Sequence, residues 1–219
     1  MRRYDFPRHL LAMGLAALAG FIDALGFLKL GGLFISFMSG NSTRLAVGLA
    51  SGTSVAMTAA GLIGAFVGGV MMGAMLAQAA GRWRKQAVLG LVTLLLGIGG
   101  MLTAVDHAGG GLTLLMAGAM GVVNNVFQRD GEVSVGVTYM TGTLVKLGQA
   151  LAAALGGGAR LGWMPYLLLW LGLVSGAVAG AALFPVMDLA ALWIACAFSA
   201  LLLGWSFRMG PVPAASRLA

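Results

Sequence analysis

Eight apolar runs follow one another along this chain, and they constrain its fold more than any other feature of the sequence. They occupy residues 10–28, 33–51, 54–80, 87–105, 112–128, 133–155, 164–184 and 187–207. Runs of about 17 to 27 residues can cross the roughly 30 Å hydrocarbon core of a bilayer. Charged residues make up 9% of the chain, whereas a globular domain carries roughly a quarter. The sequence therefore predicts an all-α polytopic membrane protein, with the lipid bilayer as its partner and residues 1–219 as one transmembrane domain.

A segment from the first half of the chain recurs in the second half. The sequence FMSGNSTRLAVGLA at residues 37–50 matches YMTGTLVKLGQALA at residues 139–152, an offset of 102. The identical positions in the first copy are Met38, Gly40, Leu45, Leu49 and Ala50. An internal repeat around a polar Ser-Gly or Thr-Gly turn in so apolar a chain is typical of a two-fold transporter or channel. We therefore divide the chain into repeat one, residues 10–105, and repeat two, residues 112–207.

The charges at the ends of the runs indicate how the chain crosses the membrane. If all eight runs crossed, the basic residues would be divided five against six between the two sides, contrary to the positive-inside rule. If the second run of each repeat instead returns to its own side, ten basic residues share one side and Lys29 lies on the other, with Asp106 and Asp188. The ten are Arg2, Arg3, Arg8, Arg82, Arg84, Lys85, Arg129, Arg160, Arg208 and Arg217.

This second arrangement is the one that we predict. It contains about six transmembrane helices plus two re-entrant half-helices, and both termini are cytoplasmic. Each repeat then crosses the membrane an odd number of times, so the two repeats are inverted relative to each other.

The local sequence of the two re-entrant runs agrees with that arrangement. Residues 31–37 and 132–139 are rich in glycine, aromatic and β-branched residues, which favours extended backbone over helix. A Ser-Gly-Asn or Thr-Gly-Thr turn follows, and then an apolar run of about twelve residues, roughly 18 Å of helix. Irregular backbone at membrane depth must be surrounded by protein or line a cavity. We therefore expect each half-helix to begin near the membrane midplane, inside the bundle.

Two helix amino termini that meet from opposite sides of the membrane would form a binding site. Their unpaired N–H groups and partial positive charge favour an anion or a polar neutral solute. Arg44 and Lys146 lie one turn into the half-helices, where they could supply charge to such a site, snorkel to an interface or form a structural ion pair. The candidate substrate-binding residues are Asp23, Ser39, Gly40, Asn41, Thr43, Arg44, Asn124, Asn125, Thr141, Gly142, Thr143 and Lys146.

Asp23 is the one acidic residue in the interior of a predicted span, since Asp188 lies at the edge of the run 187–207. The counterpart of Asp23 at the same offset is Asn125, beside Asn124. Three roles are open for it. Asp23 could pair with Arg44 and compensate the first repeat, which would leave Lys146 as a positive site for a substrate anion. It could instead be a proton-coupling carboxylate, or form an ion pair with Arg44 that is purely structural.

Several motifs together carry a resemblance to a known family. They are GFIDA at 20–24, GGLF at 31–34, MSGN at 38–41, VNN at 123–125 and TYMTGT at 138–143. With these motifs the chain resembles the YoaK family of uncharacterised bacterial inner-membrane proteins, over nearly its whole length. The resemblance implies a protein of roughly six helices in the bacterial inner membrane, and it carries no settled biochemical role. Asn124 departs from the glutamine that such proteins are expected to carry there.

The sequence as a whole favours a secondary transporter or channel for a small anionic or polar solute. The alternative is a non-transporting membrane partner or assembly protein, which would not need duplicated polar motifs at one depth. We do not expect an enzyme or a cofactor, because no nucleophile–base set, metal-ligand cluster or nucleotide-binding loop is visible. The basic residues are scattered at segment ends, so no nucleic-acid partner is expected. The sequence leaves open whether the protein is a monomer or a homo-oligomer.

Overall fold

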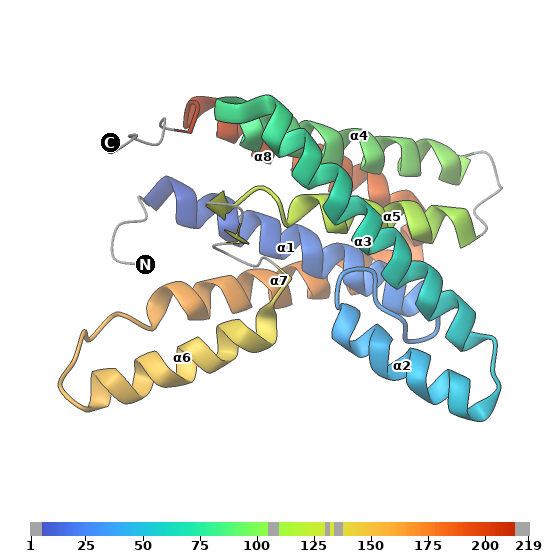
Figure 1. Cartoon of the computed structure of the whole chain (residues 1–219), viewed down its shortest axis with the longest axis horizontal. Coiled ribbons are helices and arrows are strands. Elements are labelled where there is room, and N and C mark those ends of the chain that lie inside the picture. Colours follow the sequence, from blue (N-terminus) through green and yellow to red (C-terminus); the bar gives the residue numbers. More distant parts are fainter. Residues whose placement is uncertain (1–5, 105–109, 130–131, 134–137, 213–219) are drawn as a thin grey trace.

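The computed structural model describes residues 6–104, 110–129, 132–133 and 138–212 of the chain (Figure 1). The helices are α1 (Phe6–Lys29), α2 (Met38–Ser51), α3 (Val55–Ala80), α4 (Arg84–Ala104), α5 (Gly110–Val123), α6 (Met140–Leu155), α7 (Met164–Met187) and α8 (Leu192–Arg208). Two 3-10 turns, η1 (Gly81–Trp83) and η2 (Asp188–Ala191), join α3 to α4 and α7 to α8. The two-residue strands β1 (Gln128–Arg129) and β2 (Glu132–Val133) pair antiparallel. The predicted all-α class is confirmed, and residues 134–137 of the expected extended segment 132–139 lie outside the described residues.

The first helix packs along the seventh, through glycines on α7. Gly172, Gly176 and Gly180 lie against the backbone carbonyls of Met13, Ala17 and Phe21 in turn. Residue numbers rise together on the two helices, so α1 and α7 run parallel. A side chain on these glycines would collide with the facing carbonyls, and small residues are what allow helices to approach this closely in a membrane.

Helix α3 packs on α5 in the same manner. Gly69 lies against the carbonyl of Gly118, and Gly121 lies against the carbonyl of Phe66. These two helices are also parallel, since Gly73 further along α3 meets Val122 further along α5. Helix α5 is the most enclosed of the helices, and Leu112, Met116 and Met120 on it are fully or almost fully buried.

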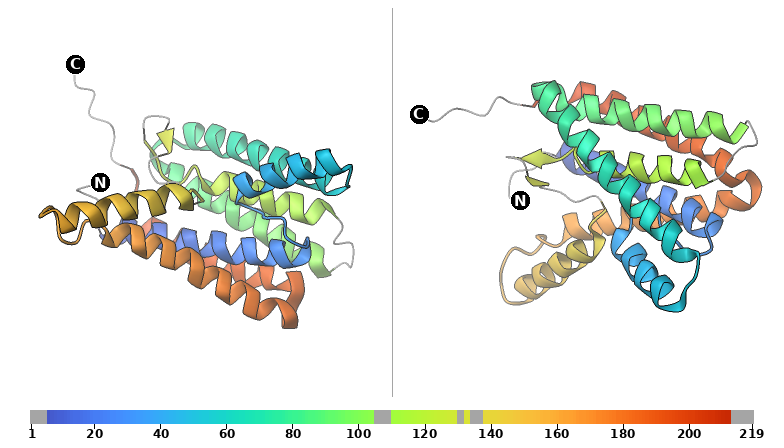
Figure 2. Two further views of the ribbon diagram at one scale, coloured as in Figure 1. Left: turned by 90° about the horizontal axis from the view of Figure 1, so that it is seen from below. Right: turned by 45° about the vertical axis from the view of Figure 1, so that its right-hand side comes forward.

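Helices α4 and α8 form the third long pair, and they run antiparallel. Gln86 Nε2 donates to the Ser206 carbonyl at 2.9 Å, and the hydroxyls of Thr93 and Ser199 lie 2.8 Å apart. Residue numbers therefore fall on α8 as they rise on α4. Figure 1 and Figure 2 agree that α1, α4 and α7 run in one direction along the bundle, and that α3, α5 and α8 run in the other.

The two ends of the bundle differ in charge. The start of α1 and the end of α8 share one end, where Trp205 Nε1 donates to the Pro7 carbonyl at 3.4 Å. The backbone N–H of Val212 donates there to the Arg82 carbonyl at 2.9 Å. Basic residues of four helix ends gather at that end, namely Arg8, Arg82, Arg84, Lys85 and Arg208. At the other end Lys29 Nζ lies 2.6 Å from Asp188 Oδ2.

Helices α2 and α6 are short, with 14 and 16 residues, or roughly 21 and 24 Å of helix. Both begin near the middle of the bundle and diverge toward opposite ends (Figure 1). Before α2, residues 30–37 are not helical and lead the chain from the end of α1 back to the middle. Gly31 and Gly32 have φ angles of +63° and +106° in this segment, a region that glycine adopts without steric cost. The chain therefore turns back toward the middle of the bundle between α1 and α2.

Three helical stretches are long and apolar enough to cross a membrane among the described residues. They are Pro7–Lys29, Val55–Thr103 and Met164–Arg208, and a shorter apolar helix covers Gly110–Val123. Large apolar side chains are exposed on their outer faces, including Met57, Met75 and Leu201. Such surfaces suit contact with lipid tails rather than with water.

Candidate functional site

The carboxylate of Asp23 on α1 holds the segment that leads into α2. Its Oδ1 accepts hydrogen bonds from the backbone N–H groups of Ile35 and Ser36, at 2.8 and 2.6 Å. Its Oδ2 accepts one from the Ser36 hydroxyl, at 2.6 Å. Phe37 at the N-cap position of α2 makes no side-chain cap in the described structure. A negative group from α1 therefore lies where the positive end of the α2 dipole begins, a favourable arrangement.

Asn41 fixes the same segment from the side of α2. This fully buried side chain accepts a hydrogen bond from the Phe34 N–H at 2.9 Å and donates one to the Phe34 carbonyl at 2.6 Å. It thereby satisfies both backbone groups of a residue outside regular secondary structure. Asn41 is committed to the protein's own backbone.

The second repeat contains a related contact. Thr138 lies 102 residues after Ser36, and its hydroxyl donates to Asn124 Oδ1 at 3.0 Å. Asn124 in turn donates to the Met120 carbonyl at 2.9 Å. Asn124 therefore takes the place that Asp23 has in the first repeat.

This contact corrects the sequence prediction, in which the repeat offset of 102 made Asn125 the counterpart of Asp23. Asn125 instead donates to the Val70 carbonyl at 3.1 Å, across the α3–α5 interface. The first helices of the two repeats are offset by 101 residues and the half-helices by 102, so one residue is added in between.

The expected pair between Asp23 and Arg44 does not form in the described structure. The hydrogen-bond partners of Asp23 are Ile35 and Ser36, and the described ion pair is Lys29 with Asp188. Arg44 is exposed, and its guanidinium lies over Gly32, where an added Cβ would be 2.6 Å from it. The physical reason is distance, because Arg44 lies about 9 Å of helix beyond the start of α2, where Asp23 binds.

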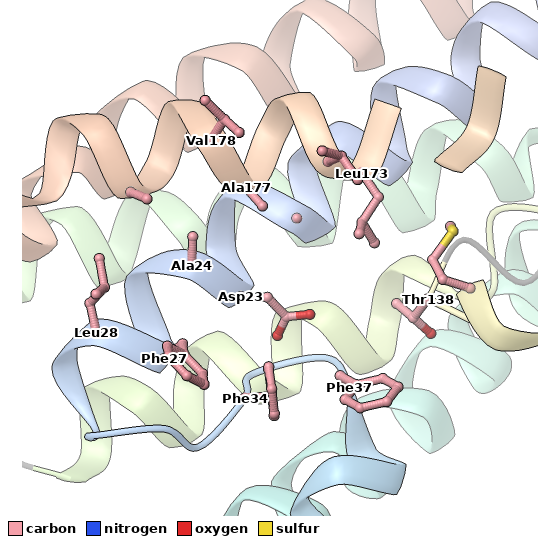
Figure 3. Close-up of a pocket in the computed structure, with 14 residues that line it drawn as sticks. Asp23, Ala24, Phe27, Leu28, Phe34, Phe37, Thr138, Leu173, Ala177 and Val178 are labelled. Carbon is pink, nitrogen blue, oxygen red and sulfur yellow. The ribbon is translucent and has the colours of Figure 1, made fainter. Parts of the chain in front are cut away.

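A cavity of about 660 Å³ opens beside Asp23, between α1, α7 and the starts of the two half-helices. Figure 3 shows the Asp23 carboxylate pointing into it, with Thr138 on the far side. Phe27, Phe34 and Phe37 line one wall, and aliphatic residues of α7 such as Leu173 and Val178 line another. Phe37 precedes α2 and Met140 begins α6, so the cavity lies where both half-helices start.

The structure brings few of the sequence candidates to this cavity. Asp23 lines it, and Asn124 contacts it through Thr138. Gly40 packs under the ring of Phe37, which an added Cβ would meet at 2.7 Å. The exposed candidates on the half-helices are Ser39, Thr43, Arg44, Thr141, Gly142 and Lys146. Thr143 is buried, and its hydroxyl donates to the Tyr139 carbonyl at 3.3 Å.

Sequence reasoning missed several residues that line the cavity. These are the hydroxyl of Thr138 and the rings of Phe27, Phe34 and Phe37. A signal for Thr138 was present, because Ser36 and Thr138 are both hydroxyl residues at the repeat offset. The phenylalanines gave no such signal, because aromatic residues in an apolar chain are expected in any core.

Comparisons with known proteins agree with a membrane protein. Residues 11–205 match a family described as "Protein of unknown function (DUF1275)". The chain is also similar to a UPF0700 transmembrane protein of Rhizobium meliloti (strain 1021), with 34% identity over 220 residues that cover 95% of this chain and 92% of that protein. No solved structure matches the chain. The chain therefore belongs to the DUF1275 family, an uncharacterised family of membrane proteins.

Proposed function

We propose that this membrane protein is a secondary transporter or channel for a small polar solute, which passes through the cavity beside Asp23. The observation that carries the proposal is the position of that cavity. It combines a carboxylate and a hydroxyl with about 660 Å³ of space, at the point where two short helices begin in the middle of an apolar bundle. Polar groups at membrane depth are costly and are retained where a solute or ion must pass.

The proposed topology has six crossings, with α2 and α6 re-entrant, in two inverted repeats. The opposite directions of the repeat counterparts support it, since α1 and α5, α3 and α7, and α4 and α8 run oppositely. The packing is also symmetric between the repeats. The first helix of each repeat packs on the third helix of the other repeat, α1 on α7 and α5 on α3. The stretch Val55–Thr103 would be roughly 74 Å long as one helix, and it instead turns back at η1.

The proposed location is the bacterial inner membrane with both termini in the cytoplasm. The gathering of Arg8, Arg82, Arg84, Lys85 and Arg208 at the end that holds the start of α1 supports this orientation. The resemblance of the motifs to the YoaK family agrees with that location.

The geometry favours a polar solute over an anion. The interpretation as an anion site depended on Arg44 and Lys146, and both are exposed near the middle of their helices, α2 and α6. Neither lines the cavity, whereas Asp23 does. A negatively charged wall would repel an anion rather than hold it.

Uptake into proteoliposomes tests the proposal. The purified protein is reconstituted, and entry of a panel of small polar solutes (glycerol, urea, glycine, betaine and ethanolamine) is followed by stopped-flow light scattering. We expect Ala177→Trp to fill the cavity, because Ala177 lines it, and to lower uptake at least tenfold. Val67→Trp places the same ring on a half-exposed position of α3, so it is the matched control and should leave uptake unchanged.

Two outcomes would count against the proposal. Uptake equal in both variants would mean that solute does not use the cavity. The second outcome is that no solute enters and that Ala24→Cys, in the cavity wall, does not react with a water-soluble thiol reagent. This outcome would favour a non-transporting membrane partner or assembly protein.

A further inference from the structure

The lining of the cavity indicates which polar solutes it suits, and this inference rests on the proposed function. Three phenylalanine rings form one continuous wall (Figure 3). The ring centroids of Phe27 and Phe34 are 5.2 Å apart, and those of Phe34 and Phe37 are also 5.2 Å apart, the latter pair edge to face. The face of an aromatic ring carries partial negative charge and attracts cations.

Asp23 adds a carboxyl group, which can carry a full negative charge, beside that wall. Of the lining residues in the described part of the chain, it is the one whose side chain can carry a charge. Lys29, which is near in sequence, is bound to Asp188 at the end of the bundle, and Arg44 lies over Gly32. The amides at the start of α2 balance only about half a charge. A carboxylate in apolar surroundings is costly without a cationic partner, so a ligand that supplies one is favoured.

The remaining capacity of the polar groups fits a donor-bearing ligand. Oδ2 of Asp23 accepts one hydrogen bond in the described structure, from Ser36, and a carboxylate oxygen can accept a second. The Thr138 hydroxyl donates its hydrogen bond to Asn124. The lone pairs of its oxygen can therefore accept a hydrogen bond from a further donor. Both groups can thus accept a hydrogen bond from an N–H, and neither offers a proton to an anion.

We propose that the cavity binds a small organic cation, a protonated amine with an apolar body. The cationic nitrogen lies between the Asp23 carboxylate and the phenylalanine wall. The apolar body packs against Leu173 and Val178 of α7. A cavity of about 660 Å³ is of the size that holds drug-sized ligands.

Binding of two probes of the same shape and opposite charge tests the proposal. Tetraphenylphosphonium and tetraphenylborate are titrated onto the protein in nanodiscs, and empty nanodiscs give the background of partition into lipid. We expect saturable binding of the cation and none of the anion. Asp23→Asn keeps one oxygen as acceptor for the backbone N–H groups of Ile35 and Ser36, turns an amide donor toward the Ser36 hydroxyl, and removes the charge. It should weaken binding of the cation at least tenfold.

Two further variants make the test decisive. Asp188→Asn makes the same charge change on an exposed residue at the end of the bundle, so it should leave the affinity unchanged. Phe34→Leu keeps an apolar side chain but removes the ring, and it should weaken binding of the cation about threefold to tenfold. It serves as the second readout if Asp23→Asn does not yield a monodisperse protein.

Three results would overturn the assignment. These are unchanged affinity in both Asp23→Asn and Phe34→Leu, binding of the borate as tight as that of the phosphonium, and no saturable binding of the phosphonium. If neutral solutes still enter proteoliposomes in a manner blocked by Ala177→Trp, the organic-cation inference alone falls. If Ala177→Trp has no effect either, the proposed function falls with it.

Discussion

At the scale of single residues, the polar side chains near the cavity divide between holding the backbone and facing open space. Asn41 has its hydrogen bonds within the protein, whereas Asp23 both holds the segment before α2 and faces the cavity. The sequence pointed to Asp23 because an acidic residue in a span is rare. It could not supply the correct partner, because Ile35 and Ser36 come near Asp23 only when the chain returns to the middle of the bundle.

Asn41→Ala should destabilise the protein. It leaves the N–H and carbonyl of Phe34 without their partners, and two lost hydrogen bonds in a buried place cost about 2 kcal/mol. The measurement is the free energy of unfolding by titration with sodium dodecyl sulfate. Ser42→Ala on the next position of α2 is the control, because Ser42 is exposed and bonds its own helix, and it should change stability by less than about 0.5 kcal/mol. Equal effects of the two substitutions would refute the role given to Asn41.

At the scale of elements, the starts of the short helices α2 and α6 were what the sequence predicted most closely. The glycine pair at 31–32 marked the non-helical entry. The expected Ser-Gly-Asn turn at 39–41 is instead the first turn of α2, which begins at Met38. The repeat offset of 102 placed the start of α6 at Met140 as well. The sequence did not predict which long helices pack on each other. Most long helices are apolar on all sides, so no one face of the helix is marked as the packing face.

Gly176→Ala should separate α1 from α7. The added methyl group would meet the carbonyl of Ala17, which is backbone and cannot turn away. Overpacking of this kind costs roughly 1–3 kcal/mol, measurable by the same titration. Gly68→Ala on α3 is the matched control, since nothing lies within 4 Å of its added Cβ; alanine there should be neutral or stabilise by up to about 1 kcal/mol. If the control lost as much stability as Gly176→Ala, close helix approach would not be the cause.

At the scale of the whole molecule, the charges at the ends of the runs predict six crossings, where the count of apolar runs alone would give eight. Five of the basic residues that the sequence assigned to one side, Arg8, Arg82, Arg84, Lys85 and Arg208, lie at one end of the bundle, and Lys29 lies at the opposite end. Eight apolar runs suggested eight crossings, and it was the charges that singled out two runs as different. The cavity wall was not predictable at this scale, because it combines residues from α1, α7 and both half-helices.

Labelling of single cysteines tests the inverted arrangement. In a Cys196→Ala background, cysteine at Ser51, the last residue of α2, and at Gly157, just after α6, should react with a membrane-impermeant maleimide from opposite sides. Both positions are exposed, and α2 and α6 diverge toward opposite ends of the bundle. A cysteine at Val212, whose backbone N–H donates to the Arg82 carbonyl, marks the side from which Gly157 should react. Reaction of Ser51 and Gly157 from the same side would rule out the inverted repeats.

The pairing of α1 with α7 also sets the order in which the protein can be assembled during synthesis. About 160 residues separate the end of α1 from the end of its main partner. At a ribosomal rate of about 5–20 residues per second, that is a delay of roughly 8 to 30 seconds. During this time the face of α1 that packs against the glycines of α7 is uncovered. Biogenesis of this chain therefore includes a period in which its first helix depends on lipid, or on another membrane protein, until α7 is made.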